Sequence, residues 1–135
     1  MSEIYSASYQ VGWIDIDANG HMSNSRYLDY ATQTRFRCLA ERGFSPDDFR
    51  RHGIGPVMFE DTLRYRSELR FLDEFTVSFE YERLDEEGRK FRVVNRFTRA
   101  GEEVAVVDAR GAWFDLETRS VVVPPAKLLA ALSSD

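Results

Sequence analysis

The sequence holds a single cysteine, Cys38, and only two histidines among its 135 residues. One cysteine excludes an intrachain disulfide framework and is typical of a reducing compartment. His21 and His52 stand far apart and follow no zinc-ligand spacing, so we expect no bound metal and no other cofactor. The sequence Gly-x-Ser-x-Gly does not occur, which argues against the nucleophile elbow of a serine hydrolase.

Long apolar runs and a surplus of basic residues are also missing. No run approaches the roughly 20 apolar residues of a membrane-spanning helix, and the first residues lack the basic and apolar regions of a secretory signal. We therefore expect a cytoplasmic protein without membrane contact. The formal net charge is −5, which argues against nucleic-acid binding because that depends on neutralising phosphates. An anionic ligand would need a local basic patch.

What is present predicts one globular domain over residues 1–135. A hydrophobic fraction of 43% with 13% aromatic residues suits one packed core. Residue composition and turn signals separate a helix at 24–42 from the strands and place a short helix after Pro125. The expected strands span residues 4–13, 57–69, 75–84, 90–99, 103–116 and 121–123.

The predicted helix at 24–42 has no internal Gly or Pro and is followed by Gly43, a stop signal. Ser23 or Asn24 would provide its N-cap. Its mostly apolar positions form two adjacent stripes, suited to packing against a sheet, and Cys38 is expected in the core. The stripes are Tyr27, Ala31, Thr34 and Cys38, and Leu28, Ala31, Arg35 and Leu39.

The order of elements is one strand, one long helix and then a meander of long antiparallel strands, which indicates the α+β class. The outer strands of such a sheet would expose unpaired backbone groups. Pairing across copies is a usual remedy for exposed edges, so we expect a homo-oligomer.

The loop before the helix is rich in acids and amides. Residues 15–20, Asp-Ile-Asp-Ala-Asn-Gly, reproduce the first half of a calcium-binding EF-hand loop. Position twelve of that pattern requires a bidentate carboxylate but is Arg26 here, which argues against calcium. A second interpretation is that Asp15, Asp17 and Asn19 merely stabilise a turn through bonds to their own backbone.

A third interpretation comes from the wider pattern, in which Trp13, Asp15-Ile-Asp17, Gly20-His21, Ser23-Asn24 and Tyr27-Leu28 follow one another. This pattern resembles the signature of the hot-dog fold thioesterases, in particular the 4-hydroxybenzoyl-CoA thioesterase family. The resemblance implies a hot-dog fold, with a curved antiparallel sheet of about five to six strands wrapped around one long central helix. Ser23 departs from the pattern, because these proteins characteristically have an Asn pair at positions 23 and 24.

The resemblance also implies a site. It places the catalytic carboxylate on Asp17, as a nucleophile or as a general base for water. Asp15 is the competing candidate for that role, because alternation along the strand end puts it on the same side, but it is expected to order the loop. The backbone amide near Asn24, at the start of the helix, would polarise the thioester carbonyl, because helix N-termini offer free amides and partial positive charge. His21 would position substrate, assist Asp17 or simply hydrogen-bond the loop. His52 is expected to be a surface residue.

The implied activity is hydrolysis of an acyl-CoA or acyl-carrier-protein thioester. Tyr27, Tyr30 and Ala31 are candidates for an apolar acyl pocket. The basic residues Arg89, Lys90 and Arg92 would receive the phosphates of CoA, or they are simply a solvated strand face. A second alternating row could serve instead, consisting of Arg64, Arg66 and Arg70.

Two other functions remain open. A non-catalytic acyl-CoA-binding protein could use the same fold, and a hot-dog dehydratase would want a histidine paired with an acid across a pocket. For the leading interpretation we expect a homodimer or a dimer of dimers. The sequence does not select an acyl chain length.

Overall fold

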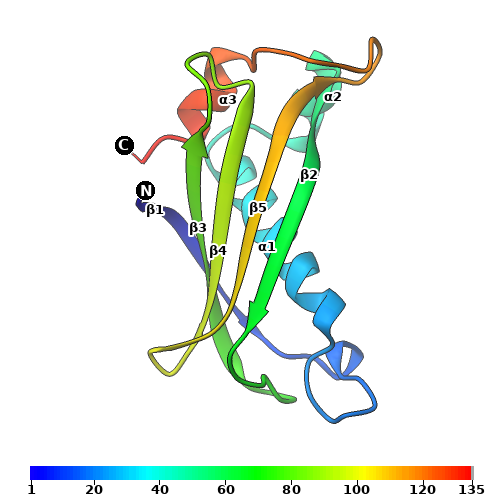
Figure 1. Cartoon of the computed structure of the whole chain (residues 1–135), viewed down its shortest axis with the longest axis vertical. Helices are drawn as coiled ribbons and strands as arrows, with labels where there is room; N and C mark the ends of the chain where they lie inside the picture. The colour runs from blue at the N-terminus through cyan, green and yellow to red at the C-terminus, as the bar shows by residue number, and fades with distance from the viewer. Residues whose placement is uncertain (135) are drawn as a thin grey trace.

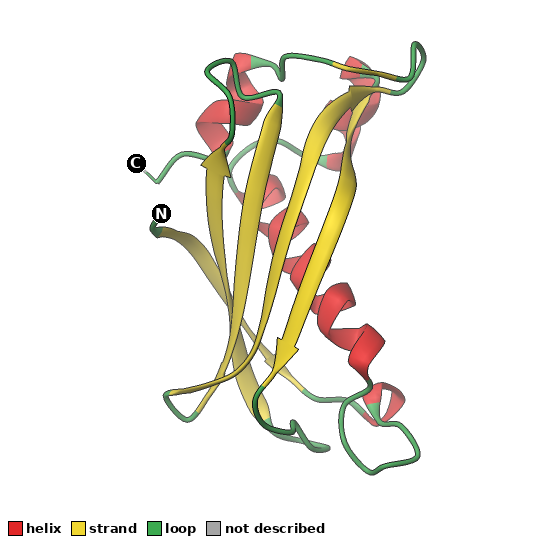
Figure 2. Ribbon diagram, in the orientation of Figure 1, coloured by secondary structure: helices red, strands yellow, loops and turns green. Residues whose placement is uncertain are grey.

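A computed structural model describes residues 1–134 of the chain. One antiparallel sheet covers a diagonal helix, and two shorter helices lie at one end of the sheet (Figures 1 and 2). The strands are β1 (Glu3–Gln10), β2 (Ile54–Tyr65), β3 (Glu74–Arg83), β4 (Lys90–Arg99), β5 (Glu102–Asp115) and β6 (Ser120–Val121). The helices are α1 (Asn24–Glu41), α2 (Pro46–His52) and α3 (Ala126–Ala131), and a 3-10 turn spans Trp13–Asp15.

The strand order across the sheet is β1-β3-β4-β5-β2, with β6 paired to β5. All these pairings are antiparallel. The predicted fold class is confirmed, because the curled antiparallel sheet is that of the hot-dog fold. The expected meander is correct only for β3, β4 and β5. The strand β2 instead lies at the far edge, since it pairs with β5 and not with the strand that follows it in the chain.

The helix α1 ends one residue before its predicted limit. It packs against β1, β3 and β5, and its first predicted stripe, Tyr27, Ala31, Thr34 and Cys38, is buried as expected. Thr34 tolerates burial because its hydroxyl donates to the carbonyl of Tyr30 at 2.7 Å and lies 2.9 Å from the hydroxyl of Tyr9. The second stripe is less regular, because Arg35 is only partly buried.

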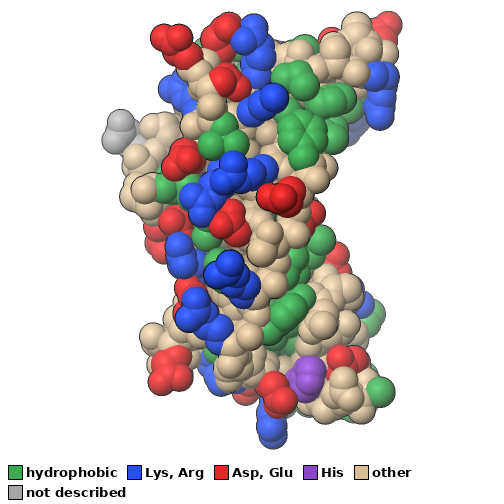
Figure 3. Space-filling view, in the orientation of Figure 1, with side chains coloured by type: hydrophobic (Ala, Val, Ile, Leu, Met, Phe, Trp, Pro, Cys, Tyr) green, Lys and Arg blue, Asp and Glu red, His purple; other side chains and the backbone are tan. Residues whose placement is uncertain are grey.

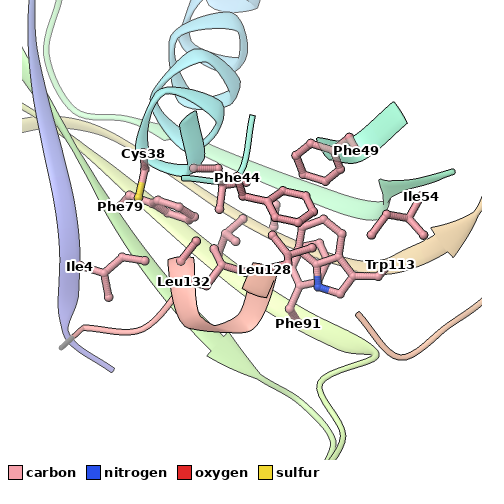
Figure 4. Close-up of a cluster of buried hydrophobic side chains, with 14 residues drawn as sticks. Ile4, Cys38, Phe44, Phe49, Ile54, Phe79, Phe91, Trp113, Leu128 and Leu132 are labelled. Carbon is pink, nitrogen blue, oxygen red and sulfur yellow. The ribbon is translucent and has the colours of Figure 1, made fainter. Parts of the chain in front are cut away.

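Two clusters of buried side chains fill the space between α1 and the sheet. One cluster gathers aromatic residues near α2 and α3, where the rings of Phe91 and Trp113 lie 4.9 Å apart (Figure 4). The other surrounds Tyr27 and Phe97 near the beginning of α1. Burying such side chains contributes about 1.5–3 kcal/mol each, so these clusters hold the helix against the sheet.

The helix α2 was not expected from the sequence. Its signal is Ser45-Pro46-Asp47-Asp48, in which the Ser45 backbone amide donates to the carboxylate of Asp48 at 2.7 Å and the Asp48 amide donates to the Ser45 hydroxyl at 3.3 Å. This is a capping box with Pro at the first helical position. His52, in its last turn, is exposed as expected and stacks on the ring of Phe44.

Gly111 on β5 leaves no room for a side chain beside β2. A Cβ at this position would lie 2.6 Å from the Val57 carbonyl oxygen and 2.8 Å from the sulfur of Met58. We expect Gly111→Ala to lower the free energy of unfolding by about 2 kcal/mol, because backbone atoms must move to admit the methyl group. Urea denaturation measures this loss. Gly55→Ala is the control, since its Cβ would meet only the Leu116 side chain at 3.6 Å; equal stability of the two variants contradicts the prediction.

Candidate active site

The loop between β1 and α1 is ordered around Asp15. Asp15 is 5% exposed, and its carboxylate accepts from the Tyr30 hydroxyl at 2.6 Å and from the Gly12 amide at 2.9 Å. The guanidinium of Arg26 lies 3.6 Å from the same carboxylate. Burial and the bond to Asp15 raise the pKa of Tyr30. These are the contacts of a residue that orders the loop.

Asp17 lies two residues further on, in a tight turn. Its backbone amide donates to the carbonyl of His21 at 3.0 Å, and the amide of Gly20 donates to its carbonyl at 3.1 Å. One carboxylate oxygen accepts from the Asn19 amide at 2.9 Å. Gly20 has φ of 86°, which favours glycine there. Asp17 is half-buried, and its second carboxylate oxygen accepts no hydrogen bond from the residues that the structure describes.

The N-terminus of α1 follows this turn directly. Ser23 occupies the N-cap, as one of the two expected positions, but no hydrogen bond from its side chain caps the helix. Its hydroxyl lies instead 3.3 Å from the hydroxyl of Ser25. The backbone amide of Asn24 therefore stands at a helix start that no side chain closes among residues 1–134. Such an amide is suited to bind a negatively charged oxygen.

His21 lines a hollow of about 230 Å³ beside the helix start. Its Nε2 lies 3.9 Å from the carboxylate of Glu68, and its Nδ1 lies 3.3 Å from the carbonyl of Met22. The hydroxyl of Tyr65 donates to the carbonyl of Asn24 at 3.4 Å across the same hollow. The full lining is His21, Met22, Asn24, Tyr27, Tyr65, Arg66, Ser67 and Glu68.

Of the three residues expected to line an acyl pocket, only Tyr27 reaches this hollow. Tyr27 is 2% exposed and Ala31 is fully buried in the core. The hydroxyl of Tyr30 is engaged by Asp15. An acyl group would therefore need space beyond these side chains.

The predicted CoA-binding cluster lies at the other end of the sheet. Arg89 and Lys90 follow the β3–β4 turn, and their backbone amides donate to the carboxylate of Asp85 at 3.0 and 2.7 Å. These bonds lower the pKa of Asp85. At about 3.3 Å per residue, Lys90 lies about 30 Å along β4 from Arg99, which contacts Glu68 beside His21. One chain therefore does not bring Arg89 and Lys90 to Asp17.

Arg92 points to the outer face of the sheet, where it forms a bidentate pair with Asp108 at 2.8 and 3.0 Å. Figure 3 shows this face crossed by alternating basic and acidic side chains. Arg64 and Arg66 of the alternative row line a hollow of about 290 Å³ there together with Arg92. Arg70 does not join them and pairs with Glu68 instead. The alternative row is therefore split, because Arg64 and Arg66 line the outer hollow and Arg70 pairs with Glu68.

The family follows from the sequence as a whole, which matches the Thioesterase-like superfamily over residues 11–132. The chain belongs to this superfamily. The matched range includes the acidic loop, which follows strand β1, whereas an EF-hand loop follows a helix.

Solved structures agree with this fold. A gentisyl-coenzyme A thioesterase is similar with a TM-score of 0.82 and 20% identity, over 96% of this chain and 100% of the other. A 1,4-dihydroxy-2-naphthoyl-CoA thioesterase from Synechocystis has a TM-score of 0.86 and 14% identity, over 95% of this chain and 94% of the other. A Staphylococcus aureus protein in complex with CoA has a TM-score of 0.83 and 19% identity, over 97% of this chain and 82% of the other. At these identities the likeness establishes the Thioesterase-like fold.

Sequence reasoning missed Glu68 and Tyr65, which share the hollow with His21. No local signal could have found them, because the loop after β2 reaches His21 only through the fold. Within residues 1–134, no group of three or more His, Cys, Asp or Glu side chains could hold a metal ion. No described helix is long and apolar enough to cross a membrane.

Proposed function

We propose that this member of the Thioesterase-like superfamily hydrolyses acyl-CoA thioesters at the loop that carries Asp17. The proposal is carried by the position of Asp17, which is half-buried and lies in the turn directly before α1, where no side chain caps the helix start. Residues 13–28 also resemble the 4-hydroxybenzoyl-CoA thioesterase family, which supports assignment to that branch.

In the proposed reaction the thioester oxygen faces the amide near Asn24. Asp17 attacks the carbonyl carbon to form an anhydride, or removes a proton from the water that attacks. On the first route the carbon–sulfur bond breaks as the anhydride forms, and water then hydrolyses the anhydride, which releases the free acid and regenerates Asp17. On the second route the carbon–sulfur bond breaks when the tetrahedral adduct collapses. On both routes CoA leaves as the thiol, with a proton from the water consumed. The helix start stabilises the negative charge on the oxygen. Losing one such donor typically reduces the stabilisation of the transition state by about 3–4 kcal/mol. His21 is proposed to position the substrate.

The similar structures support a CoA thioester over a carrier-protein thioester. One is named for a gentisyl and one for a dihydroxynaphthoyl group, and a third contains CoA. These names favour an aromatic acyl group for this chain also. The hydrolysis assay should therefore include benzoyl and hydroxybenzoyl thioesters beside straight-chain ones.

A homodimer, or a dimer of dimers, in the cytoplasm completes the proposal. Among the described strands, β1 pairs only with β3, and β2 pairs only with β5. Both edges of the sheet are thus open, and β2 offers 12 residues for pairing. Antiparallel pairing of two copies about a twofold axis would bring the Asp17 loop of one copy toward the Arg89–Lys90 turn of the other.

A non-catalytic acyl-CoA-binding role is the second candidate. It is favoured by the bond between Asp17 and the Asn19 amide, which is the contact of an ordinary turn residue. The two functions are separated by offering the purified protein a panel of acyl-CoAs and following free thiol. Binding without thiol release, across short, long and aromatic acyl groups, would favour the second candidate.

The role of the β3–β4 turn can be tested separately. We expect the double substitution Arg89→Gln with Lys90→Gln to raise KM for an acyl-CoA about tenfold, since charge-assisted bonds to phosphate contribute roughly 1.5–3 kcal/mol. KM for the matching acyl-pantetheine, which lacks the nucleotide, should not change. Steady-state kinetics with both substrates measures this difference. The matched control is Arg64→Gln with Arg110→Gln on the outer face, away from the hollow beside His21, and a larger rise in KM there would move the nucleotide to that face.

A further inference from the structure

A cavity of about 260 Å³ lies between the second half of α1 and the sheet, away from the Asp17 loop. Apolar side chains make most of its wall, including Phe79, Phe91 and Trp113, whose arrangement Figure 4 shows. For comparison, an apolar cavity of about 150 Å³ in another protein holds one benzene ring. The cavity therefore has room for one ring or a short chain together with a polar group.

One wall of this cavity carries a cation. Arg35 extends from α1 and donates from Nε to the side-chain oxygen of Asn95 at 2.8 Å. Its Nη2 is closed off from solvent and has no hydrogen-bond partner among the described residues. Burial lowers the pKa of Arg35 to about 10, so the guanidinium still carries its charge at neutral pH. The half-buried guanidinium therefore has one neutral partner, Asn95, and no ion pair among the described residues.

The rest of the lining supplies no counter-charge. None of the residues that line the cavity is an aspartate or glutamate. The negative charge of Asp61 on β2 acts on Arg35 without forming an ion pair among residues 1–134. Tyr81 adds a hydroxyl, which already accepts from the Trp113 indole at 3.4 Å and can donate its own proton. The polar groups of the cavity thus offer donors and lack an anionic acceptor.

We propose that this cavity binds a ring-sized organic carboxylate, with the carboxylate on Arg35 and the apolar body against Phe79, Phe91 and Trp113. The guanidinium can donate a charge-assisted bond to the carboxylate, and the apolar walls gain from covering a ring. The carboxylate has two sources, a free acid or the far end of a dicarboxylic acyl thioester. The second source rests on the hydrolysis and the dimer proposed above, because within one chain Arg35 lies eleven residues, or about 16 Å, along α1 from Asn24, beyond the reach of a short acyl group. The first source does not.

Direct binding tests the cavity without any hydrolysis. Trp113 lines the cavity whereas Trp13 is exposed, so Trp13→Phe leaves one tryptophan that reports occupancy. Benzoate is expected to change its fluorescence saturably, at a concentration at least about tenfold lower than neutral benzamide needs. Arg35→Met should abolish this preference, and Arg35→Lys, which keeps the charge, should retain part of it. The control is Arg37→Met, an exposed position on the same helix, which should keep the preference.

Two five-carbon thioesters distinguish the two sources of the carboxylate. If the acyl group provides the carboxylate, glutaryl-CoA is hydrolysed with about tenfold or greater kcat/KM than pentanoyl-CoA, and Arg35→Met removes the difference. If a free acid is the occupant, the two thioesters react alike while benzoate still binds. If no thioester is cleaved, the proposed function fails but the benzoate titration still decides on the cavity. Equal responses to benzoate and benzamide, or a preference that survives Arg35→Met in a folded protein, overturn the proposal.

Discussion

Replacing Asp17 by asparagine is expected to lower kcat/KM for acyl-CoA hydrolysis at least about 100-fold, because an amide can neither attack the thioester nor accept a proton from water. The turn itself should survive, since the asparagine oxygen can still accept from the Asn19 amide as the carboxylate does at 2.9 Å. The free energy of unfolding should therefore change little. Free-thiol release and urea denaturation, measured on the same preparation, check both expectations.

Asp29→Asn is the matched control for this substitution. Asp29 lies on α1, is exposed, and pairs with Arg26 at 3.2 Å, so it gives the same change in charge near the loop without touching the turn. Its kcat/KM should stay within about twofold of the wild type, as expected for a surface substitution. Retained activity in Asp17→Asn would rule out both proposed roles of Asp17. If activity is lost, a single turnover of the wild type in ¹⁸O-water distinguishes the two roles, because only a nucleophilic Asp17 can acquire the label.

Local signals in the sequence were sufficient for much of the fold. The limits of β4 coincide with the predicted 90–99, because turn residues flank it on both sides. The helix α1 begins at the predicted Asn24, where a short polar residue precedes an apolar stripe. The first strand was predicted to extend to residue 13 but ends at Gln10, and a 3-10 turn follows at Trp13–Asp15. In this turn the Gly12 amide donates to the Asp15 carboxylate and not to a neighbouring strand.

Features that depend on distant residues could not be predicted in this way. The position of β2 beside β5 depends on pairing between residues about 50 apart in the chain. The contact of His21 with Glu68 depends on the same crossover, because it brings the loop after β2 to the start of α1. Arg35 occupied a stripe that the helical period assigned to packing, and only the structure places its charge in a cavity. Sequence patterns therefore pointed to residues of the loop and did not point to those that the fold brings beside it.

Replacing Asp15 by alanine is expected to lower the free energy of unfolding by about 3 kcal/mol. The change leaves the Tyr30 hydroxyl and the Gly12 amide without their acceptor, and each unsatisfied buried donor costs about 1–3 kcal/mol. Urea denaturation measures the loss. A stability equal to that of the wild type would contradict the view that Asp15 holds the loop in place.

Tyr30→Phe shows how much of that loss belongs to one bond. If the bond of 2.6 Å between Tyr30 and Asp15 is the main contact, the double variant should lose less stability than the sum of the two single losses, by about 1–2 kcal/mol. Strict additivity would instead assign the effect of Asp15 to the Gly12 amide and to Arg26. Because Tyr30 lies on α1 and Asp15 on the loop, a measurable coupling would mean that this bond fixes the loop to the helix. Asp17 and the open start of α1 would then keep their relative position through a contact that neither of them makes.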